Sequence, residues 1–514
     1  MTTQRPGDQG ANNSRGSVAG AGWRCPARDL KALLPAERRG KPPFRWSNLG
    51  TLLESRNDQL AKWLGDPSPE QRQLWLRDRY GDSSPDLRLD RTDLSEPSLL
   101  LVGDTGEGDA SQYALLALLE HLGQDSDFMV ICSDVIYPGG EVEQYEHKFF
   151  HPYRGYLAPI YALPGNHDWY DDLRGFMFHF CGRDRQPKRP KPSLLSRARL
   201  RERLWRRNPR SPDPARVERM RALRSHPEQQ ASLPGPYYVI DTGPIELVAI
   251  DTGIVSGIDC VQGEWLRRVS RSPKPKILLT GKPIYVDAKH RPCEIDGGRG
   301  GTVDAIVRDP DCNYIAAIGG DIHNYQRYTV DVDGRALQYI VTGGGGAFMH
   351  ATHKIPNIDK SDLQGVRETN FRCYPLRGDS LSFYSLLYDR KFPGSWAIDP
   401  DQAAAYMSER LAIEATKDDA KGVKVSDETR RKARRVFPLP GRGRGPLHSW
   451  FSEFFDWNEP PLFKNALRID ATGDRVTITC HAATGCVEDH LREPEDQLVC
   501  ERHADGSWRW QNDP

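Results

Sequence analysis

Short apolar runs recur along the middle of the chain, and each run is followed by a polar loop. The runs are 97–102, 128–132, 159–163, 276–280, 314–318 and 336–342. Helical patterns at 110–122 and 262–269 lie between them, and the segments 236–241 and 245–251 indicate a hairpin. Buried strands that alternate with helices predict a layered α/β domain. In such sheets, ligands bind outside the carboxyl ends of the strands.

The flanking segments have different patterns. Leu52, Leu53, Leu60, Trp63 and Leu64 recur at helical spacing, which predicts one amphipathic helix. These patterns predict four segments: a disordered tail at 1–22, a helical N-terminal cover at 23–96, the core at 97–350, and a C-terminal extension at 351–514. That extension is expected to contain a small β module with a strand pair at 465–480, and an aromatic cluster at 450–457 that packs within the module.

Composition excludes some classes of function. The 514 residues contain 71 Lys or Arg and 71 Asp or Glu, so the chain as a whole is not a nucleic-acid coat or a polybasic membrane binder. Neither a secretory signal nor a membrane-spanning run is visible, which predicts a cytoplasmic protein with reduced cysteines. Locally, however, 183–224 contains sixteen Lys or Arg against four Asp or Glu.

That basic segment lies inside a longer insertion at 183–230. One interpretation is a solvated, partly helical excursion, which is the usual case for a run of charge. The other is a contact surface for a polyanion, such as a nucleic acid, a nucleotide or an anionic headgroup. Trp205 could then stack on a base.

Metal-binding residue types follow the apolar runs. They are Asp104, Asp134, Asn166, Asp321 and His323. Phosphate-ester hydrolysis requires that the anionic ester be neutralised, water be activated and the leaving oxygen be stabilised, and two cations that share a carboxylate can do all three. Each of these residues alone is a common turn residue. Together, at successive strand ends, they predict a metal centre.

The same residues stand in motifs that resemble the calcineurin-like metallophosphoesterases. The motifs are Gly103-Asp104-x-Gly106, Asp134-x-x-Tyr137, Gly165-Asn166-His167-Asp168 and Gly320-Asp321-x-His323-Asn324-Tyr325. The Asp-x-x-Tyr spacing and the ending at Arg327 are most similar to the purple acid phosphatase branch. The resemblance covers about 99–346 and implies a four-layer α/β/β/α sandwich.

It also implies two metal sites. The ligands of the first would be Asp104, Asp134, Tyr137 and His323, all of which are present. The second would share Asp134 and add Asn166 and two histidines, but those two positions hold Gly281 and Asp321. The remaining oxygen donors suit Mn²⁺ or Mg²⁺ better than Zn²⁺. A phenolate ligand would suit iron. One or two divalent or trivalent ions are therefore expected.

Four further residues are candidates for direct roles in the reaction. His167 is expected to protonate the leaving oxygen or to stabilise the transition state, and Asp168 to orient His167. Arg327 could bind a phosphate oxygen. The ammonium of Lys282 could stand in for a weak or absent second metal, or could simply face solvent.

The sequence thus predicts a metal-dependent hydrolase of phosphate mono- or diesters that uses metal-bound hydroxide. Two alternatives stay open. The loss of a ligand at Gly281 favours a catalytically degenerate phosphoesterase that acts as a binding or scaffold protein, and the basic insertion favours a nuclease or nucleotide phosphohydrolase.

Overall fold

The computed structural model describes residues 28–41, 44–83, 85–189, 196–206, 211–224, 232–391, 396–414, 421–436, 460–486 and 492–511. The tail predicted at 1–22 and the aromatic cluster predicted at 450–457 lie outside these residues.

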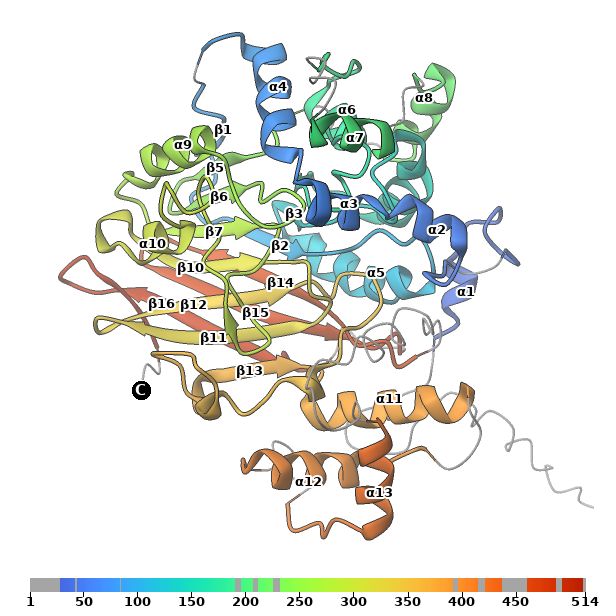
Figure 1. Cartoon of the computed structure of the whole chain (residues 1–514). Coiled ribbons are helices and arrows are strands. Elements are labelled where there is room, and N and C mark those ends of the chain that lie inside the picture. The colour runs from blue at the N-terminus through green and yellow to red at the C-terminus, as the bar shows by residue number, and fades with distance from the viewer. Residues whose placement is uncertain are drawn as a thin grey trace, which may run out of the picture.

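Two large sheets form the centre of the described structure (Figure 1). The first has eight strands, in the order β1 (Arg88–Arg91), β5 (Tyr238–Thr242), β6 (Glu246–Ile250), β7 (Lys276–Thr280), β10 (Tyr314–Gly319), β12 (Arg335–Thr342), β11 (Tyr325–Val332) and β13 (Phe371–Tyr374). The second has seven, in the order β17 (Trp508–Trp510), β16 (Asp496–Arg502), β15 (Arg475–Ala483), β14 (Lys464–Ala471), β2 (Ser98–Val102), β3 (Phe128–Cys132) and β4 (Ile160–Leu163). A two-stranded ribbon pairs β8 (Tyr285–Val286) with β9 (Lys289–His290).

The central strands are parallel, which explains their unbroken apolar runs. β2, β3 and β4 pair in parallel, as do β6, β7, β10 and β12. Every residue of β3, β4, β6, β7 and β10 is buried. Strands covered on both faces have no polar side to alternate with. The expected hairpin is also confirmed, because β5 pairs antiparallel with β6.

Helices cover the outer faces of the two sheets, so the four-layer α/β/β/α order is confirmed (Figure 1). α5 (Ala110–Leu122) packs on the second sheet; α9 (Cys260–Ser270) and α10 (Val303–Arg308) pack on the first. α6 (Arg174–Cys181), α7 (Arg197–Leu204) and α8 (Pro214–Ala222) follow β4. α11 (Arg377–Lys391), α12 (Pro400–Leu411) and α13 (Asp427–Val436) form a helical group beyond β13.

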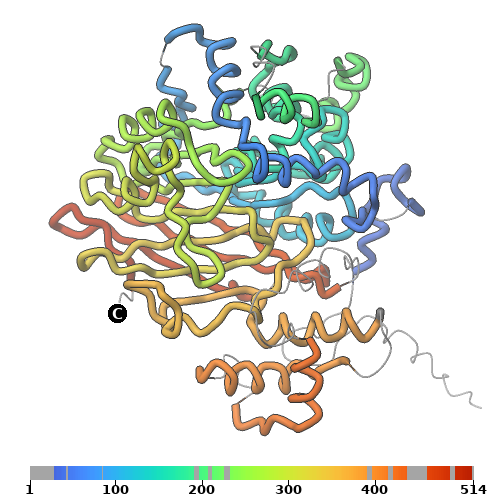
Figure 2. The backbone as a smooth tube through the Cα atoms, viewed as in Figure 1, coloured from blue at the N-terminus to red at the C-terminus, as the bar shows by residue number. Residues whose placement is uncertain are grey.

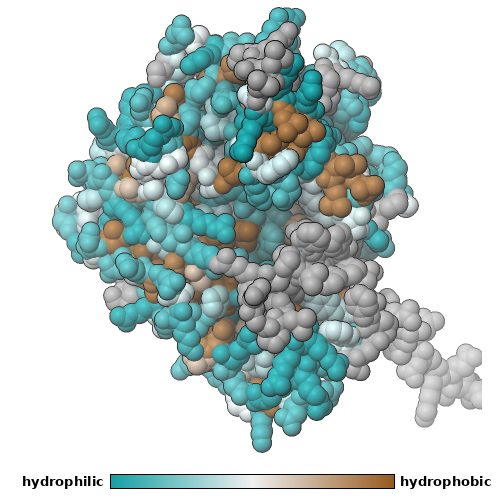
Figure 3. Space-filling view, in the orientation of Figure 1, coloured by the Kyte–Doolittle hydropathy of each residue, from teal (hydrophilic) through white to brown (hydrophobic). Residues whose placement is uncertain are grey.

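The N-terminal cover is helical, but its pattern differs from the prediction. It contains α1 (Leu30–Leu33), α2 (Leu49–Glu54), α3 (Asn57–Leu64) and α4 (Ser68–Tyr80), followed by β1. The prediction of a single amphipathic helix is wrong, because the first helix ends before Ser55 and a second one follows. The side chains of Leu53 and Trp63 are 54% and 70% exposed. Figure 3 shows apolar surface in this region. Helical spacing alone did not reveal which face packs inward.

The C-terminal strands belong to the core. β14 pairs antiparallel with β2, and β15, β16 and β17 extend the same sheet outward. Figure 2 shows these late strands running beside the early ones. The strand pair predicted at 465–480 is therefore present, but a core ending at 350 leaves out four strands of one of its own sheets. A hairpin pattern does not indicate which strand its free edge will join.

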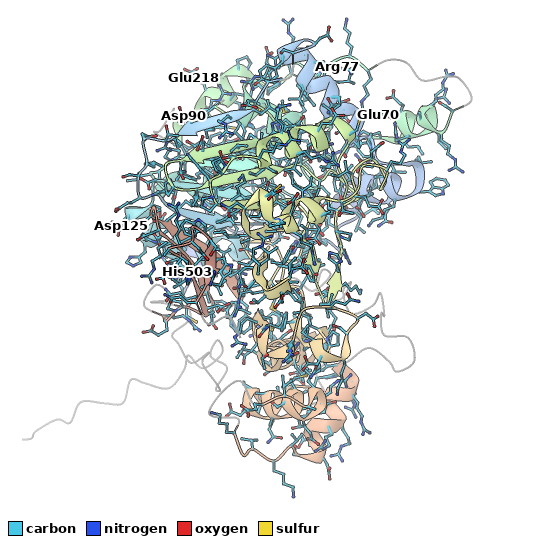
Figure 4. All side chains as sticks on the ribbon, turned by 90° about the vertical axis from the view of Figure 1, so that its left-hand side faces the viewer. Glu70, Arg77, Asp90, Asp125, Glu218 and His503 are labelled. Carbon is cyan, nitrogen blue, oxygen red and sulfur yellow. The ribbon has the colours of Figure 1, made fainter. Side chains whose placement is uncertain are left out.

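Several arginines in the described part of the basic insertion form ion pairs. They contact acidic residues of the cover and the core, in the pairs Arg183–Asp78, Arg189–Asp172, Arg201–Glu70 and Arg216–Glu143. Figure 4 labels Glu70 on α4, one of these partners. Trp205 is 5% exposed and packed in the core, so it does not present a face for a base. The described part of the insertion thus fits a packed excursion better than an open basic surface.

Two further findings concern the cysteines and the membrane. Cys486 is disulfide-bonded, which corrects the expectation that all cysteines are reduced. Among the described residues, no helix combines the length and the apolarity that crossing a membrane requires.

Candidate metal centre

The four residues expected to hold the first metal converge on one oxygen atom. The hydroxyl of Tyr137 lies 3.1 Å from Asp104 Oδ1, 3.0 Å from Asp134 Oδ2 and 3.1 Å from His323 Nε2. Asp104 follows β2, Asp134 and Tyr137 follow β3, and His323 follows β10. Because these strands end at the same edge, both sheets contribute to the group. All four side chains are buried.

Their chemistry fits a cation. A phenol has a single proton, so it can satisfy only one of the three acceptors that face it. Burial, and then the charges of Asp134 and Asp321, hold the pKa of Asp104 well above its ordinary value. Burial and the carboxylates of Asp104 and Asp134 likewise raise the pKa of Tyr137. A cation placed among these oxygens and the imidazole would offset the burial of the charged oxygens and relieve the repulsion between them, which together raise both pKa values.

His323 is fixed in the orientation that a metal ligand needs. Its Nδ1 donates to the carbonyl of Phe348 at 2.8 Å, which leaves Nε2 as the acceptor that faces Tyr137. Burial, and next His350, hold the pKa of His323 well below its ordinary value, so the ring is neutral. A hydrogen bond on the second ring nitrogen is the usual support of a ligating imidazole.

His350 contributes to this arrangement without facing the centre. Its Nδ1 accepts the backbone N–H of His323 at 2.8 Å. Burial lowers the pKa of His350 to about 3, which keeps this acceptor unprotonated. His353 lies three residues further along the chain. His353 instead contacts Ser380.

Glycines and left-handed backbone bring the strand ends close together. A Cβ on Gly165 would lie 2.2 Å from Asp134 Oδ1, and one on Gly320 would lie 2.6 Å from Asp104 Oδ2. Asp104 and Asp321 adopt positive φ values of 58° and 67°. Strain of this kind in non-glycine residues gathers at functional sites. It lets the backbone N–H of Asp321 donate to Asp104 Oδ2 at 2.8 Å.

His167 lies beside this group, and one of its ring nitrogens is hydrogen-bonded to the backbone. Its backbone N–H donates to Asp134 Oδ1 at 2.8 Å, and its Nδ1 donates to the carbonyl of Pro138 at 2.9 Å. The ring packs 4.5 Å from that of Tyr137, measured between centroids. Since Nδ1 carries the proton of the neutral ring, Nε2 is the atom through which His167 can exchange a proton.

Asp168 is hydrogen-bonded to the backbone of two loops and not to the ring of His167. Its Oδ2 accepts the backbone N–H groups of Val135 and Gly165, each at 3.0 Å. Burial, and then Asp134, raise the pKa of Asp168 to about 8. The expectation that it orients His167 is therefore corrected. Asp168 is a positioning residue that ties the loop after β3 to the loop after β4.

Arg327 lies outside the group. Its Nε donates to Asp496 Oδ2 at 2.6 Å, and its Nη1 donates to Thr329 at 2.9 Å. Asp496 begins β16, so this pair connects β11 of the first sheet to a C-terminal strand of the second. The structure thus corrects the expectation of a phosphate contact. The sequence pattern around Arg327 gave no sign of its remote acidic partner.

Gly281, Lys282 and Asp321 surround the position where a second metal would be expected. The ammonium of Lys282 donates to Asp321 Oδ1 and lies 3.3 Å from Asn166 Oδ1. Burial alone would lower the pKa of Lys282, but the charge and hydrogen bond of Asp321 raise it. The same ion pair lowers the pKa of Asp321 despite its burial. Lys282 therefore faces the group and does not face solvent.

The cover contributes an aromatic residue that the sequence did not single out. Trp46 is 7% exposed, and its ring centroid lies 5.4 Å from that of His167 and 5.8 Å from that of Tyr137. Its Nε1 donates to Glu107 Oε1 at 3.1 Å. Nothing in the local pattern around Trp46 indicated this contact, because it joins segments far apart in the chain.

Residues 97–325 match the family described as calcineurin-like phosphoesterase. This segment is a calcineurin-like phosphoesterase domain. This phosphoesterase domain matches a family of metal-dependent phosphoesterases. It contains every residue of the group around Tyr137.

Solved structures with a similar arrangement share little sequence with this chain. A purple acid phosphatase from yellow lupin, Lupinus luteus, is 11% identical with a TM-score of 0.38, over 81% of this chain and 55% of that one. PhoD is 10% identical with a TM-score of 0.37, over 82% and 72%. GAP50, described as the anchor in the inner membrane complex of Plasmodium, is 12% identical with a TM-score of 0.32, over 52% and 76%.

This chain thus spans about half the length of the lupin phosphatase. Among curated protein sequences, none matches it. These distant likenesses do not bear on the substrate of the phosphoesterase domain.

Proposed function

We propose that the chain hydrolyses phosphate mono- or diesters with a metal ion held by Asp104, Asp134, Tyr137 and His323. The supporting observation is the convergence of three potential ligands within 3.1 Å of the Tyr137 hydroxyl. Two carboxylates, a phenol and a neutral imidazole form a mixed donor set that suits manganese or iron. When bound, the metal supplies a Lewis acid that lowers the pKa of water and neutralises the ester.

Two side chains of the domain complete the proposed reaction. In its imidazolium form, His167 delivers the Nε2 proton to the leaving oxygen and returns to the neutral ring, while Nδ1 keeps its own proton and its bond to the carbonyl of Pro138. The ammonium of Lys282 attracts the anionic ester and stabilises charge that develops on it. Asp168 holds the loops after β3 and β4 so that Asp134 and His167 keep their relative positions.

The test compares hydrolysis of an aryl phosphate monoester and an aryl phosphate diester with Mn²⁺ added. We expect turnover that depends on the metal and is lost in Asp134→Asn, because the amide removes a charge from the centre. Asp90→Asn is the matched control, since Asp90 is an exposed carboxylate on β1, labelled in Figure 4. It should keep full activity.

The two outcomes separate the competing interpretations. Loss of turnover in Asp134→Asn alone supports hydrolysis at this centre. Folded protein with metal bound that turns over neither ester would contradict the proposal and favour a catalytically degenerate binding protein. Nuclease or nucleotide phosphohydrolase activity has less support, because several arginines in the described part of the insertion are paired with acidic residues.

A further inference from the structure

The second metal position of this domain has lost both of its expected imidazoles. Gly281 has no side chain, and a Cβ placed there would already lie 3.0 Å from the carbonyl oxygen of Pro164 and 3.0 Å from Thr252 Oγ1. That contact is tighter than ordinary packing, so the backbone leaves little room for a longer ligand. The donors that remain are the oxygens of Asp134, Asn166 and Asp321.

The ammonium of Lys282 already contacts oxygens of two of these three residues. Its ammonium binds Asp321 Oδ1 and lies 3.3 Å from Asn166 Oδ1. The Asn166 amide is held in this orientation, because its Nδ2 donates to the hydroxyl of Tyr170 at 2.9 Å. Its oxygen therefore points to the ammonium. Lys282 is only 17% exposed, so water does little to weaken the interaction.

A second metal and this ammonium exclude each other. A metal bonded to Asn166 and Asp321 would lie about 2 Å from the oxygens that the ammonium contacts. Two cations that share the same oxygens in a buried site repel strongly.

We propose that Lys282 takes the place of the second metal, so that the phosphoesterase domain works with one metal ion and one ammonium group. This inference rests on the proposed function for the first metal site. It makes Asp134 a terminal ligand of one ion and not a bridge between two. The ammonium supplies a fixed positive charge and hydrogen-bond donors on the side of the substrate where a second cation would otherwise lie.

The experiment counts Mn²⁺ per chain in the full-length protein by elemental analysis and records its electron paramagnetic resonance spectrum. Two ions that share a carboxylate lie about 4 Å apart and give a spin-coupled spectrum. We expect one ion and the uncoupled spectrum of isolated Mn²⁺. Two coupled ions in the wild type would overturn the inference and leave the proposed function standing. No bound ion would contradict both.

Lys282→Met and Lys282→Arg test the side chain itself. Methionine removes the charge at similar length, so a second ion should enter at raised Mn²⁺ and the coupled spectrum should appear. Arginine keeps the charge and should retain one ion. A methionine variant that folds, and that matches the wild type in both metal count and turnover, would overturn the inference. The wild-type count decides the question even if that variant does not fold.

One other cluster must be controlled for in the count. Among the described residues, Glu37, His147 and His151 each place a ligand atom within 4.8 Å of the other two. An ion there would add to the total, although its spectrum would stay uncoupled. The count is therefore repeated in His151→Gln. If the wild-type total is one and does not change, that ion belongs to the proposed centre.

Discussion

Arg72 of the N-terminal cover is buried and bonded to the phosphoesterase domain at three points. Its Nε lies 2.8 Å from Asp251 Oδ2, its Nη1 lies 2.6 Å from Asp259 Oδ2, and its Nη2 donates to the carbonyl of Asp251 at 2.9 Å. Asp251 also accepts from Nε1 of Trp169 at 2.9 Å, just beyond the loop that holds His167. The arginine thus links α4 to the candidate centre.

Replacing Arg72 by methionine should destabilise the protein substantially. The side chains of Arg72 and Asp251 are both 0% exposed, so the variant leaves a buried carboxylate without its charged partner. Breaking a buried pair in this way costs about 3–5 kcal/mol. For 514 residues the entropy of unfolding is about 1 kcal/mol per kelvin, so the melting temperature should fall by about 3–5 °C.

The assay is thermal unfolding followed by circular dichroism, with Arg299→Met as the matched control. Arg299 pairs with Asp296 at 2.9 Å, but its side chain is 81% exposed, so its loss should cost less than about 1 kcal/mol. Equal shifts for the two variants would refute the reasoning, because they would mean that burial of the pair contributes nothing. Arg72→Lys should fall between them, since one ammonium cannot reproduce the arginine fork.

Three further predictions concern pH, catalysis and charge. Burial would raise the pKa of Asp304, but hydrogen bonds from His290 and Tyr339 lower it below its ordinary value of 3.8. Because the pKa of Asp304 is lower in the folded protein than in the unfolded chain, its carboxylate stabilises the fold above pH 3.8. This stabilisation is lost as the pH falls through the pKa of the folded protein. Asp304→Asn should therefore melt about 2 °C below the wild type at neutral pH, and the difference should shrink in melts recorded at successively lower pH. A difference that grows in acid would contradict this sign. His167→Gln should lower kcat by about 10²–10⁴-fold while the measured metal content stays the same; a variant that instead loses its metal would place His167 among the ligands. Because several arginines in the described part of 183–224 form ion pairs with acidic residues, titrations of double-stranded DNA against salt should give a shallow slope, no steeper than about −2 in log affinity against log salt, and a much steeper slope would restore the polyanion interpretation.

The strand ends could be predicted from the sequence because their signal is local. Each buried parallel strand is an unbroken apolar run, and the polar residues in the few positions after it must lie at the carboxyl edge. Asp104, Asp134 and His323 follow that rule, and the structure brings them within 3.1 Å of one hydroxyl. The motif supplied the remaining member, Tyr137.

The errors have a shared physical origin in contacts between distant segments. Arg327 was expected at the phosphate because it stands near His323, yet Asp496, far along the chain, determines where it points. Asp168 adjoins His167 in sequence, but its oxygens satisfy backbone N–H groups of two loops. Trp46 was missed for the same reason. Sequence spacing gives the neighbours of a side chain only within one element.

The cover and the C-terminal strands therefore change what counts as the domain. Residues 97–325 contain all the candidate ligands. However, β14 pairs with β2, the strand that delivers Asp104, and Trp46 packs against His167. Both the edge that carries the ligands and the ring that would move a proton are supported by segments outside the matched region. We infer that these flanking segments hold the centre in place, because a site built on strand ends is only as rigid as the strands and loops beside it.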